Sequence, residues 1–118
     1  QRYISPLTKE LAHQVICPQT TVGQMMALIS RSRLVVCNDS APLHVAVGFD
    51  RPIVTIFGPT NPQLVGPYRR FDSVVCPAGV GGSVRYRRHR NDQSVICQVS
   101  VAMVWEKIEN ELQMSCAR

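Results

Sequence analysis

Apolar residues gather in four short runs that have the composition of β-strands. The runs lie near residues 14–17, 34–38, 52–57 and 73–76, and Val and Ile predominate in them. The second and third runs are almost continuous in apolar residues, which is typical of strands that are covered on both faces of a parallel sheet. The sequence therefore predicts four parallel strands in a buried sheet.

Helical patterns separate the first three of these runs. Thr21 and Gln24 have the spacing of a capping box, which predicts a helix over 21–31. The apolar residues of this helix recur at i, i+3, i+4 and i+7: Val22, Met25, Met26 and Ile29. A second helix is predicted over 41–48, with Pro42 in its first turn, and Gly48 is expected to end it.

A third helix is predicted over 100–114, with Ser100 as its N-cap. One apolar face of this helix is expected to pack back on the sheet: Val101, Val104, Trp105, Ile108 and Leu112. Residues 77–94 have no hydrophobic periodicity and contain three glycines and a basic run, Arg85 to Arg90, so a long loop is predicted there.

The order β-α-β-α-β predicts an α/β fold, a parallel Rossmann-like sheet with flanking helices. With 118 residues the chain is the size of one domain. Four strands are few for a self-sufficient doubly wound domain, so residues 1–118 are expected to form part of a larger lobe that lacks its first strands. The ligand of such a sheet binds at the carboxyl ends of the strands.

Charge and cysteine content narrow the classes of function. Lys and Arg number 13 against 8 acidic residues, a net charge of +5, and only two of the basic residues are lysines. This arginine bias suits phosphate groups. The seven aromatic residues do not alternate with the basic ones, so no nucleic-acid partner is expected. The five cysteines are an odd number without a CxxC spacing, and they are expected to be buried reduced thiols in the cytoplasm. No export signal precedes the first strand, and the chain is expected to begin inside a longer protein.

The most informative segment follows the second strand and has the sequence NDSAPLH. A strand that turns directly into a helix directs the unpaired amides of the first helical turn toward a ligand at the sheet edge, and these amides favour a phosphate. Ser40 can add a hydroxyl donor, and His44 lies one turn further along the helix. Capping of the helix alone would also explain Asp39 and Ser40.

A second segment, FGPTNP, follows the third strand and faces the same edge. Gly58 permits a close approach of backbone to ligand, and Thr60 lies in the loop that Pro59 and Pro62 stiffen. Taken alone, this segment would be interpreted as a rigid turn.

Together, the segments from Asp39 to His44, from Arg51 to Pro62 and from Gly66 to Tyr68 resemble the C-terminal lobe of the family 9 glycosyltransferases, the ADP-heptose:lipopolysaccharide heptosyltransferases. The resemblance extends from about Val15 to Leu112. Ala41 stands where the family usually has Gly, and Val47 stands where Ala is usual.

The resemblance implies a GT-B enzyme of two Rossmann-like lobes that transfers heptose from ADP-heptose to a lipid-anchored lipopolysaccharide core acceptor with inversion and without an essential metal or cofactor. The catalytic base of the family is an Asp of the N-terminal lobe, so no catalytic residue is expected in this chain. The chain would be a donor-binding portion, inactive alone. The implied donor-binding residues are Thr20, Thr21, Asp39, Ser40, Ala41, Leu43, His44, Gly58 and Thr60.

Four other interpretations are considered. A non-hydrolysing UDP-sugar 2-epimerase has the same architecture but carries paired glutamates where this chain has Pro42-Leu43-His44, and a non-catalytic nucleotide-binding module would fit the same fold. The basic run from Arg85 to Arg90 is interpreted as a solvated surface loop, with peripheral contact to anionic lipid or to the phosphorylated acceptor at the inner face of the membrane as the alternative. A zinc site at Cys76, His89 and Cys97 is disfavoured by the wide spacing of these residues.

Overall fold

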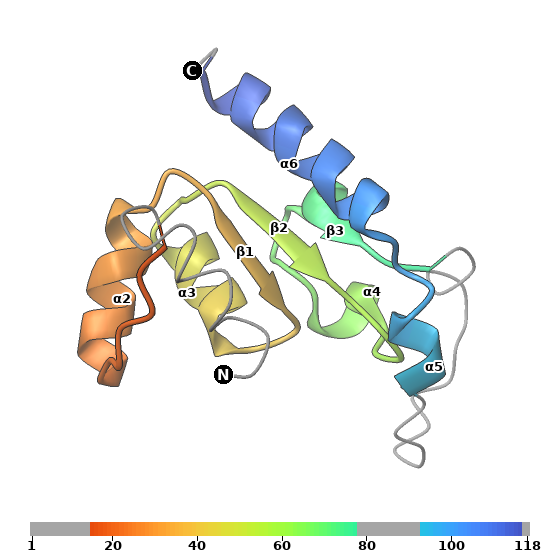
Figure 1. Cartoon of the computed structure of the whole chain (residues 1–118), viewed down its shortest axis with the longest axis horizontal. Helices are drawn as coiled ribbons and strands as arrows, with labels where there is room; N and C mark the ends of the chain where they lie inside the picture. The colour runs from red at the N-terminus through yellow and green to blue at the C-terminus, as the bar shows by residue number, and fades with distance from the viewer. Residues whose placement is uncertain (1–14, 78–92, 117–118) are drawn as a thin grey trace.

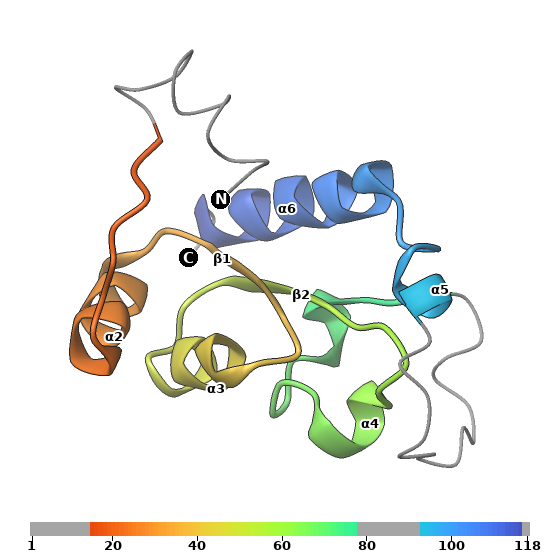
Figure 2. The same cartoon turned by 60° about the horizontal axis from the view of Figure 1, so that its bottom comes forward.

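The computed structural model describes residues 15–77 and 93–116, in which a parallel sheet lies between layers of helices. Figure 2 shows α6 on one side of the sheet and α3 with α4 on the other. The α/β fold class predicted from the sequence is thus confirmed. The elements are α2 (Val22–Arg31), β1 (Val35–Asn38), α3 (Ala41–Gly48), β2 (Ile53–Ile56), α4 (Pro62–Val65), the 3-10 turn η1 (Phe71–Ser73), β3 (Val74–Val75), α5 (Gln93–Ile96) and α6 (Val101–Cys116).

The sheet has the order β1-β2-β3 with all neighbours parallel. The register of the first pair places Val35 beside Ile53 and Asn38 beside Ile56, so both strands end at the same edge (Figure 1). The central strand, β2, carries the most completely buried residues of the sheet, as its continuous apolar sequence predicts. The carboxyl ends of β1 and β2 therefore form one edge, as expected.

The first predicted strand, near residues 14–17, is wrong. Residues 15–17 have no regular structure, and the side chain of Ile16 is 82% exposed. A strand is stable only when its backbone groups pair with a neighbour, and no strand lies beside these residues in the part of the chain that the structure describes. The apolar composition of this short run is therefore not sufficient to make it a strand.

Helix α2 begins as predicted. The Thr21 hydroxyl accepts a hydrogen bond from the Gln24 amide (3.3 Å), and the Gln24 side chain accepts one from the Thr21 amide (2.9 Å), which completes the capping box. Ile29 is buried in a cluster with Ala46 of α3 and Ile53 of β2. Helix α2 thus packs on the rest of the fold mainly through its contact with α3.

Helix α3 ends through a left-handed residue that the sequence did not single out. The amide of Asp50 donates to the Val47 carbonyl (3.1 Å) and the amide of Arg51 to the Ala46 carbonyl (2.9 Å), the two bonds of a Schellman motif. The helix does end at Gly48, but the positive φ that closes it, 55°, belongs to Asp50.

The buried side of α6 differs from the predicted apolar face. Half-buried residues recur along the helix and include the predicted Val104, Ile108 and Leu112. Val101 and Trp105 are 85% and 59% exposed. The exposed indole N–H of Trp105 donates to the Glu109 carboxylate (2.8 Å) on the same face of the helix.

The chain between the predicted elements holds three short elements that the sequence pattern did not reveal: α4, η1 and α5. Helix α4 starts where the Asn61 side chain accepts a hydrogen bond from the Gln63 amide (2.9 Å). The predicted loop over 77–94 lies mostly outside the described residues, and its end is taken by α5.

Candidate functional site at the carboxyl edge of the sheet

The candidate site lies where β1 passes directly into α3. Ser40 is the N-cap, and its extended backbone (φ −162°, ψ 171°) turns the chain into the helix. The first four amides of a helix have no partner within it. In α3 these positions are Ser40, Ala41, Pro42 and Leu43. Because Pro42 has no N–H and the Leu43 amide donates to the Ser40 carbonyl (3.0 Å), the amides of Ser40 and Ala41 remain for a ligand.

The hydroxyl of Ser40 does not cap its own helix. It donates to the carbonyl of Asn38, 3.0 Å away, and accepts nothing from the first turn of α3. In contrast, the side chains of Thr21, Asn61 and Ser100 each accept a hydrogen bond from an amide of the helix that they precede. The amides of Ser40 and Ala41 lie before the positions that an N-cap side chain reaches, so they stay open to an external acceptor whichever way the Ser40 hydroxyl turns.

The predicted site residues separate into two groups. Asp39 is half-buried beside the turn, and Ser40, Ala41 and His44 are exposed at the start of α3. Leu43 is fully buried, so its side chain belongs to the core and does not contact a ligand.

The loop after β2 borders the same edge. Thr60 is half-buried in it, whereas Gly58 is buried. A Cβ on Gly58 would lie 3.1 Å from the Cβ of Ile96 in α5, so the side of Gly58 that was expected to face a ligand faces α5 instead. Sequence reasoning missed Ile96, because a four-residue helix leaves no periodic signal.

Thr20 and Thr21 lie just before α2, and both are exposed. The hydroxyl and amide of Thr21 are engaged in the capping box described above. Figure 1 shows that α2 and α3 start toward the same end of the molecule, the end to which β1 and β2 point. The three predicted segments thus share one side of the fold.

Two cavities lie elsewhere in the described structure, and neither is lined by a predicted site residue. One, of about 300 Å³, lies at the start of β2 and is lined by charged residues that include Asp50, Arg51 and Arg70. The other, of about 250 Å³, lies between β3 and α6. The candidate site is instead an open edge.

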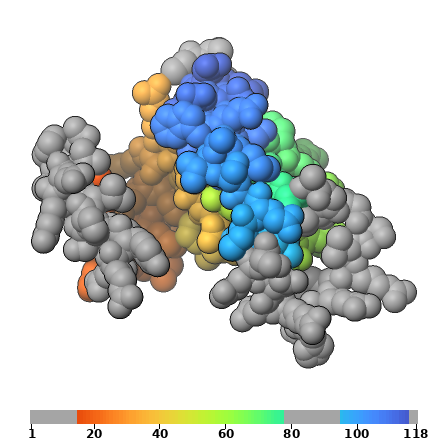
Figure 3. Space-filling view, turned by 45° about the vertical axis from the view of Figure 1, so that its right-hand side comes forward, coloured from red at the N-terminus to blue at the C-terminus, as the bar shows by residue number. Residues whose placement is uncertain are grey.

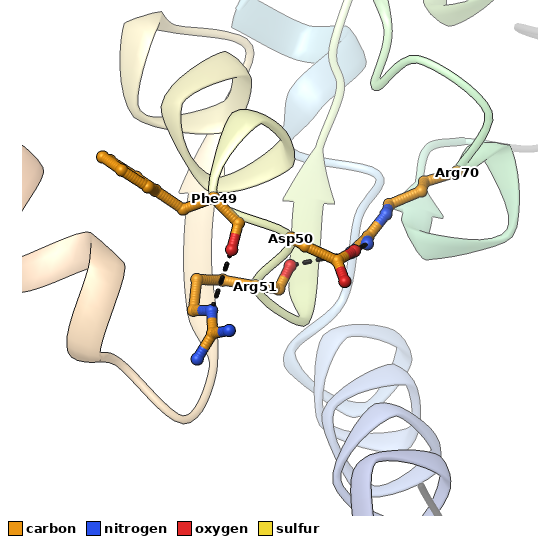
Figure 4. Close-up of polar contacts among 4 residues, drawn as sticks. All are labelled: Phe49, Asp50, Arg51 and Arg70. Carbon is orange, nitrogen blue, oxygen red and sulfur yellow. Dashed lines mark hydrogen bonds and ion pairs between the residues drawn. The ribbon is translucent and has the colours of Figure 1, made fainter.

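The amino edge of the sheet is held by a polar cluster (Figure 4). The Arg70 guanidinium forms an ion pair with the Asp50 carboxylate and donates to the Arg51 carbonyl (2.8 Å), while Arg51 Nε donates to the Phe49 carbonyl (3.1 Å). These contacts join the turn after α3 to the segment before η1, at the end of the sheet opposite to the candidate site.

Four cysteines with described side chains are free, but not all are buried as predicted. Cys17 and Cys97 are exposed, while Cys37 and Cys76 are half-buried. Burial in β1 raises the pKa of the Cys37 thiol. His89 of the disfavoured zinc site lies outside the described residues, and residues 15–77 and 93–116 contain no group of three metal-binding side chains. No helix in these ranges is long and apolar enough to cross a membrane.

A parallel sheet with helices on both faces, and a helix whose first turn opens at the carboxyl edge, define a Rossmann-like α/β protein. The sequence model of glycosyltransferase family 9 (heptosyltransferase) matches residues 3–91, and the chain belongs to this family.

Individual relatives agree with this assignment. The chain is 39% identical over 49 residues to lipopolysaccharide heptosyltransferase 2 of Salmonella typhimurium (42% of this chain, 14% of that protein). It is 29% identical over 72 residues to lipopolysaccharide heptosyltransferase 1 of Escherichia coli K12 (61% and 22%), and 37% identical over 60 residues to lipopolysaccharide core heptosyltransferase OpsX of Haemophilus influenzae (51% and 17%). The matches thus span between 14% and 22% of these relatives. No solved structure matches the chain significantly.

Proposed function

We propose that this chain is the donor-binding portion of an inverting heptosyltransferase, which transfers heptose from ADP-heptose to the core of lipopolysaccharide. Membership of glycosyltransferase family 9 supports the transfer reaction and favours it over the epimerase alternative. The relatives are named as lipopolysaccharide heptosyltransferases, which supports the same sugar and acceptor. In this proposal residues 1–118 form part of the C-terminal, nucleotide-sugar-binding lobe of a GT-B enzyme.

One observation carries the assignment of the donor site to α3. The amides of Ser40 and Ala41 precede the intrahelical bonds of α3 and lie outside the reach of an N-cap side chain, so both are available to the diphosphate. The positive end of the helix dipole adds about 1 kcal/mol to the binding of an anion there. Ser40 and Ala41 would thus hold phosphate oxygens through their backbone, and the hydroxyl of Ser40 can exchange its internal acceptor for the ligand.

The other predicted residues contribute in different ways. Asp39 only accepts hydrogen bonds when ionised, so it would contact hydroxyl groups of the donor and not its phosphates. His44, exposed one turn further on, can donate to a phosphate oxygen. Thr20 and Thr60, which flank the edge from two other segments, would border the nucleotide.

The open edge is consistent with a donor that is enclosed only when a second lobe packs over it. In this proposal the acceptor and the catalytic base belong to that second lobe, and the enzyme acts in the cytoplasm at the inner face of the membrane on a lipid-anchored acceptor. The isolated chain would bind the nucleotide without transferring sugar.

The Ala41 amide provides a direct test. Ala41 is the first residue of α3, where proline is tolerated, and the extended backbone of Ser40 is compatible with a following proline. Ala41→Pro therefore removes one amide donor and keeps the helix. Loss of a hydrogen bond to a charged group should weaken ADP binding by about tenfold in calorimetry.

Val101→Pro is the matched control. Val101 is the first residue of α6, it is 85% exposed, and it lies outside the proposed site. Its substitution should leave the affinity for ADP unchanged. The proposal is wrong if the wild-type chain does not bind ADP, or if Ala41→Pro binds ADP as tightly as the wild type does.

A further inference from the structure

The buried face of Gly58 brings a distant segment of the chain to the candidate site. Gly58 follows Phe57 at the end of β2, and Ile96 belongs to α5, 38 positions further along the sequence. A Cβ placed on Gly58 would lie 3.1 Å from Ile96 Cβ, 3.5 Å from Ile96 Cγ1 and 3.7 Å from Ile96 Cα. Figure 1 and Figure 2 both show α5 beside the end of β2. The missing side chain at position 58 is what permits this approach.

The contact is held firmly on the side of Ile96. The amides of Gln98 and Val99 donate to the carbonyls of Val95 and Ile96 (3.2 and 3.0 Å), which closes the turn after α5. The chain then enters α6 through Ser100, which caps the helix. Because α6 packs on β2 and β3, the segment that follows Ile96 is anchored to the same sheet that carries Gly58. Figure 3 shows α5 and α6 as one continuous blue surface over the sheet.

The contact is also held on the side of Gly58. The Phe57 amide donates to the Val75 carbonyl of β3 (2.9 Å), and Asn61 caps α4. The loop between these anchors is short and contains Thr60, one of the proposed donor-binding residues. A shift of Gly58 against fixed anchors must therefore be absorbed by the loop that carries Thr60.

We infer that Gly58 and Ile96 are a positioning pair: α5 packs against the bare backbone of Gly58 and thereby sets the position of the loop after β2 at the donor site. This inference rests on the proposed function, because it assigns the loop to the binding of the nucleotide sugar. Gly58 serves contact within the protein, and the ligand meets the opposite side of the loop. Ile96 itself touches no substrate.

The test adds a Cβ at position 58 and then removes the Cβ at position 96. Gly58→Ala adds a Cβ that forces Ile96 and the loop apart by a few tenths of an ångström. Overpacking of this kind should weaken ADP binding by about threefold or more. Ile96→Gly removes the Cβ that would be struck, so the double variant Gly58→Ala/Ile96→Gly should recover most of the affinity that Gly58→Ala loses. A role limited to stability would not produce this recovery in affinity.

Gly48→Ala is the matched control, because a Cβ on Gly48 meets nothing within 4 Å. It should leave ADP affinity at the wild-type value. The inference is overturned if wild-type protein binds ADP and Gly58→Ala binds it equally well, or if the double variant binds no better than Gly58→Ala. A wild-type protein that binds no ADP would instead refute the proposed donor site, and the inference with it. Circular dichroism of each variant ensures that only folded protein is compared.

Discussion

Substitutions of Asp50 should show how much of the stability of the turn after α3 comes from backbone conformation and how much from charge. It occupies the C′ position of the helix, where glycine is preferred, with φ at 55°. Its carboxylate pairs with Arg70, whose side chain is 23% exposed while that of Asp50 is 81% exposed (Figure 4). Because the pair is largely open to solvent, its contribution should be at most about 1 kcal/mol. Alanine in a left-handed conformation costs about 1 kcal/mol.

Three substitutions separate these contributions to the free energy of unfolding. Asp50→Ala loses both the ion pair and the tolerance of positive φ, so it should cost about 1–2 kcal/mol. Asp50→Asn keeps the tolerance and loses only the charge, which should cost about 0.5 kcal/mol and disappear at 1 M salt. Asp50→Gly removes the ion pair but also relieves the cost of the positive φ, so its free energy of unfolding should lie within about 0.5 kcal/mol of that of the wild type.

Urea unfolding followed by circular dichroism at 222 nm measures these differences. Trp105 is too exposed to serve as a fluorescent probe of the core. If Asp50→Gly is as unstable as Asp50→Ala, the left-handed backbone contributes nothing and the reasoning fails. All three variants should bind ADP with wild-type affinity, because Asp50 lies at the opposite end of the sheet from the candidate site.

Three further outcomes are expected. Gly66→Ala should destabilise the protein by about 1–3 kcal/mol in urea unfolding because its Cβ would overlap a carbonyl oxygen of α4, whereas Gly23→Ala, with open space around it, should stabilise it by about 0.5 kcal/mol. Iodoacetamide should modify exposed Cys97 before Cys37, whose thiol pKa is raised by burial, and mass spectrometry can follow both reactions. Because the Cys37 thiol loses its proton more readily in the unfolded chain, the free energy of unfolding should fall as the pH rises above 9.0, the ordinary pKa of a cysteine thiol. If the proposed donor site is correct, Ala41→Gly should tighten nucleotide-sugar binding in calorimetry, because the methyl group of Ala41 would obstruct the approach of a diphosphate to the first turn of α3. An unchanged or weaker affinity would show that the methyl group is harmless.

The sequence predicts those elements whose local pattern and tertiary packing agree. Thr21 and Gln24 form their capping box because both partners lie within one turn, and β2 is buried because its whole sequence suits a central strand. The order of the two main strands and their shared edge followed from the same patterns.

The errors arise where a distant partner decides the outcome. Ile16 has the composition of a strand residue, but its exposure shows that composition without a neighbouring strand does not make a ladder. Trp105 fits the apolar stripe of α6, yet it is 59% exposed, because the sheet meets the neighbouring face of the helix at Val104, Ile108 and Leu112. The contact of Gly58 with Ile96 joins two segments that no local pattern connects.

The start of α3 also shows how a local pattern leaves two roles open. Asp39 and Ser40 are predicted either to cap α3 or to bind a phosphate. These roles use different amides, because an N-cap side chain accepts from the second or third helical residue, whereas the proposed phosphate would meet the amides of Ser40 and Ala41. Where capping is the purpose, as at Thr21, the side chain accepts from the helix that it precedes. Ser40 has the chemistry to do so, but its hydroxyl turns back to the Asn38 carbonyl. In α3 the second residue is Pro42, which has no N–H, and the Leu43 amide already donates to the Ser40 carbonyl, so no amide is left for a side-chain cap; the amides of Ser40 and Ala41 lie at the edge where a Rossmann-like sheet binds its ligand.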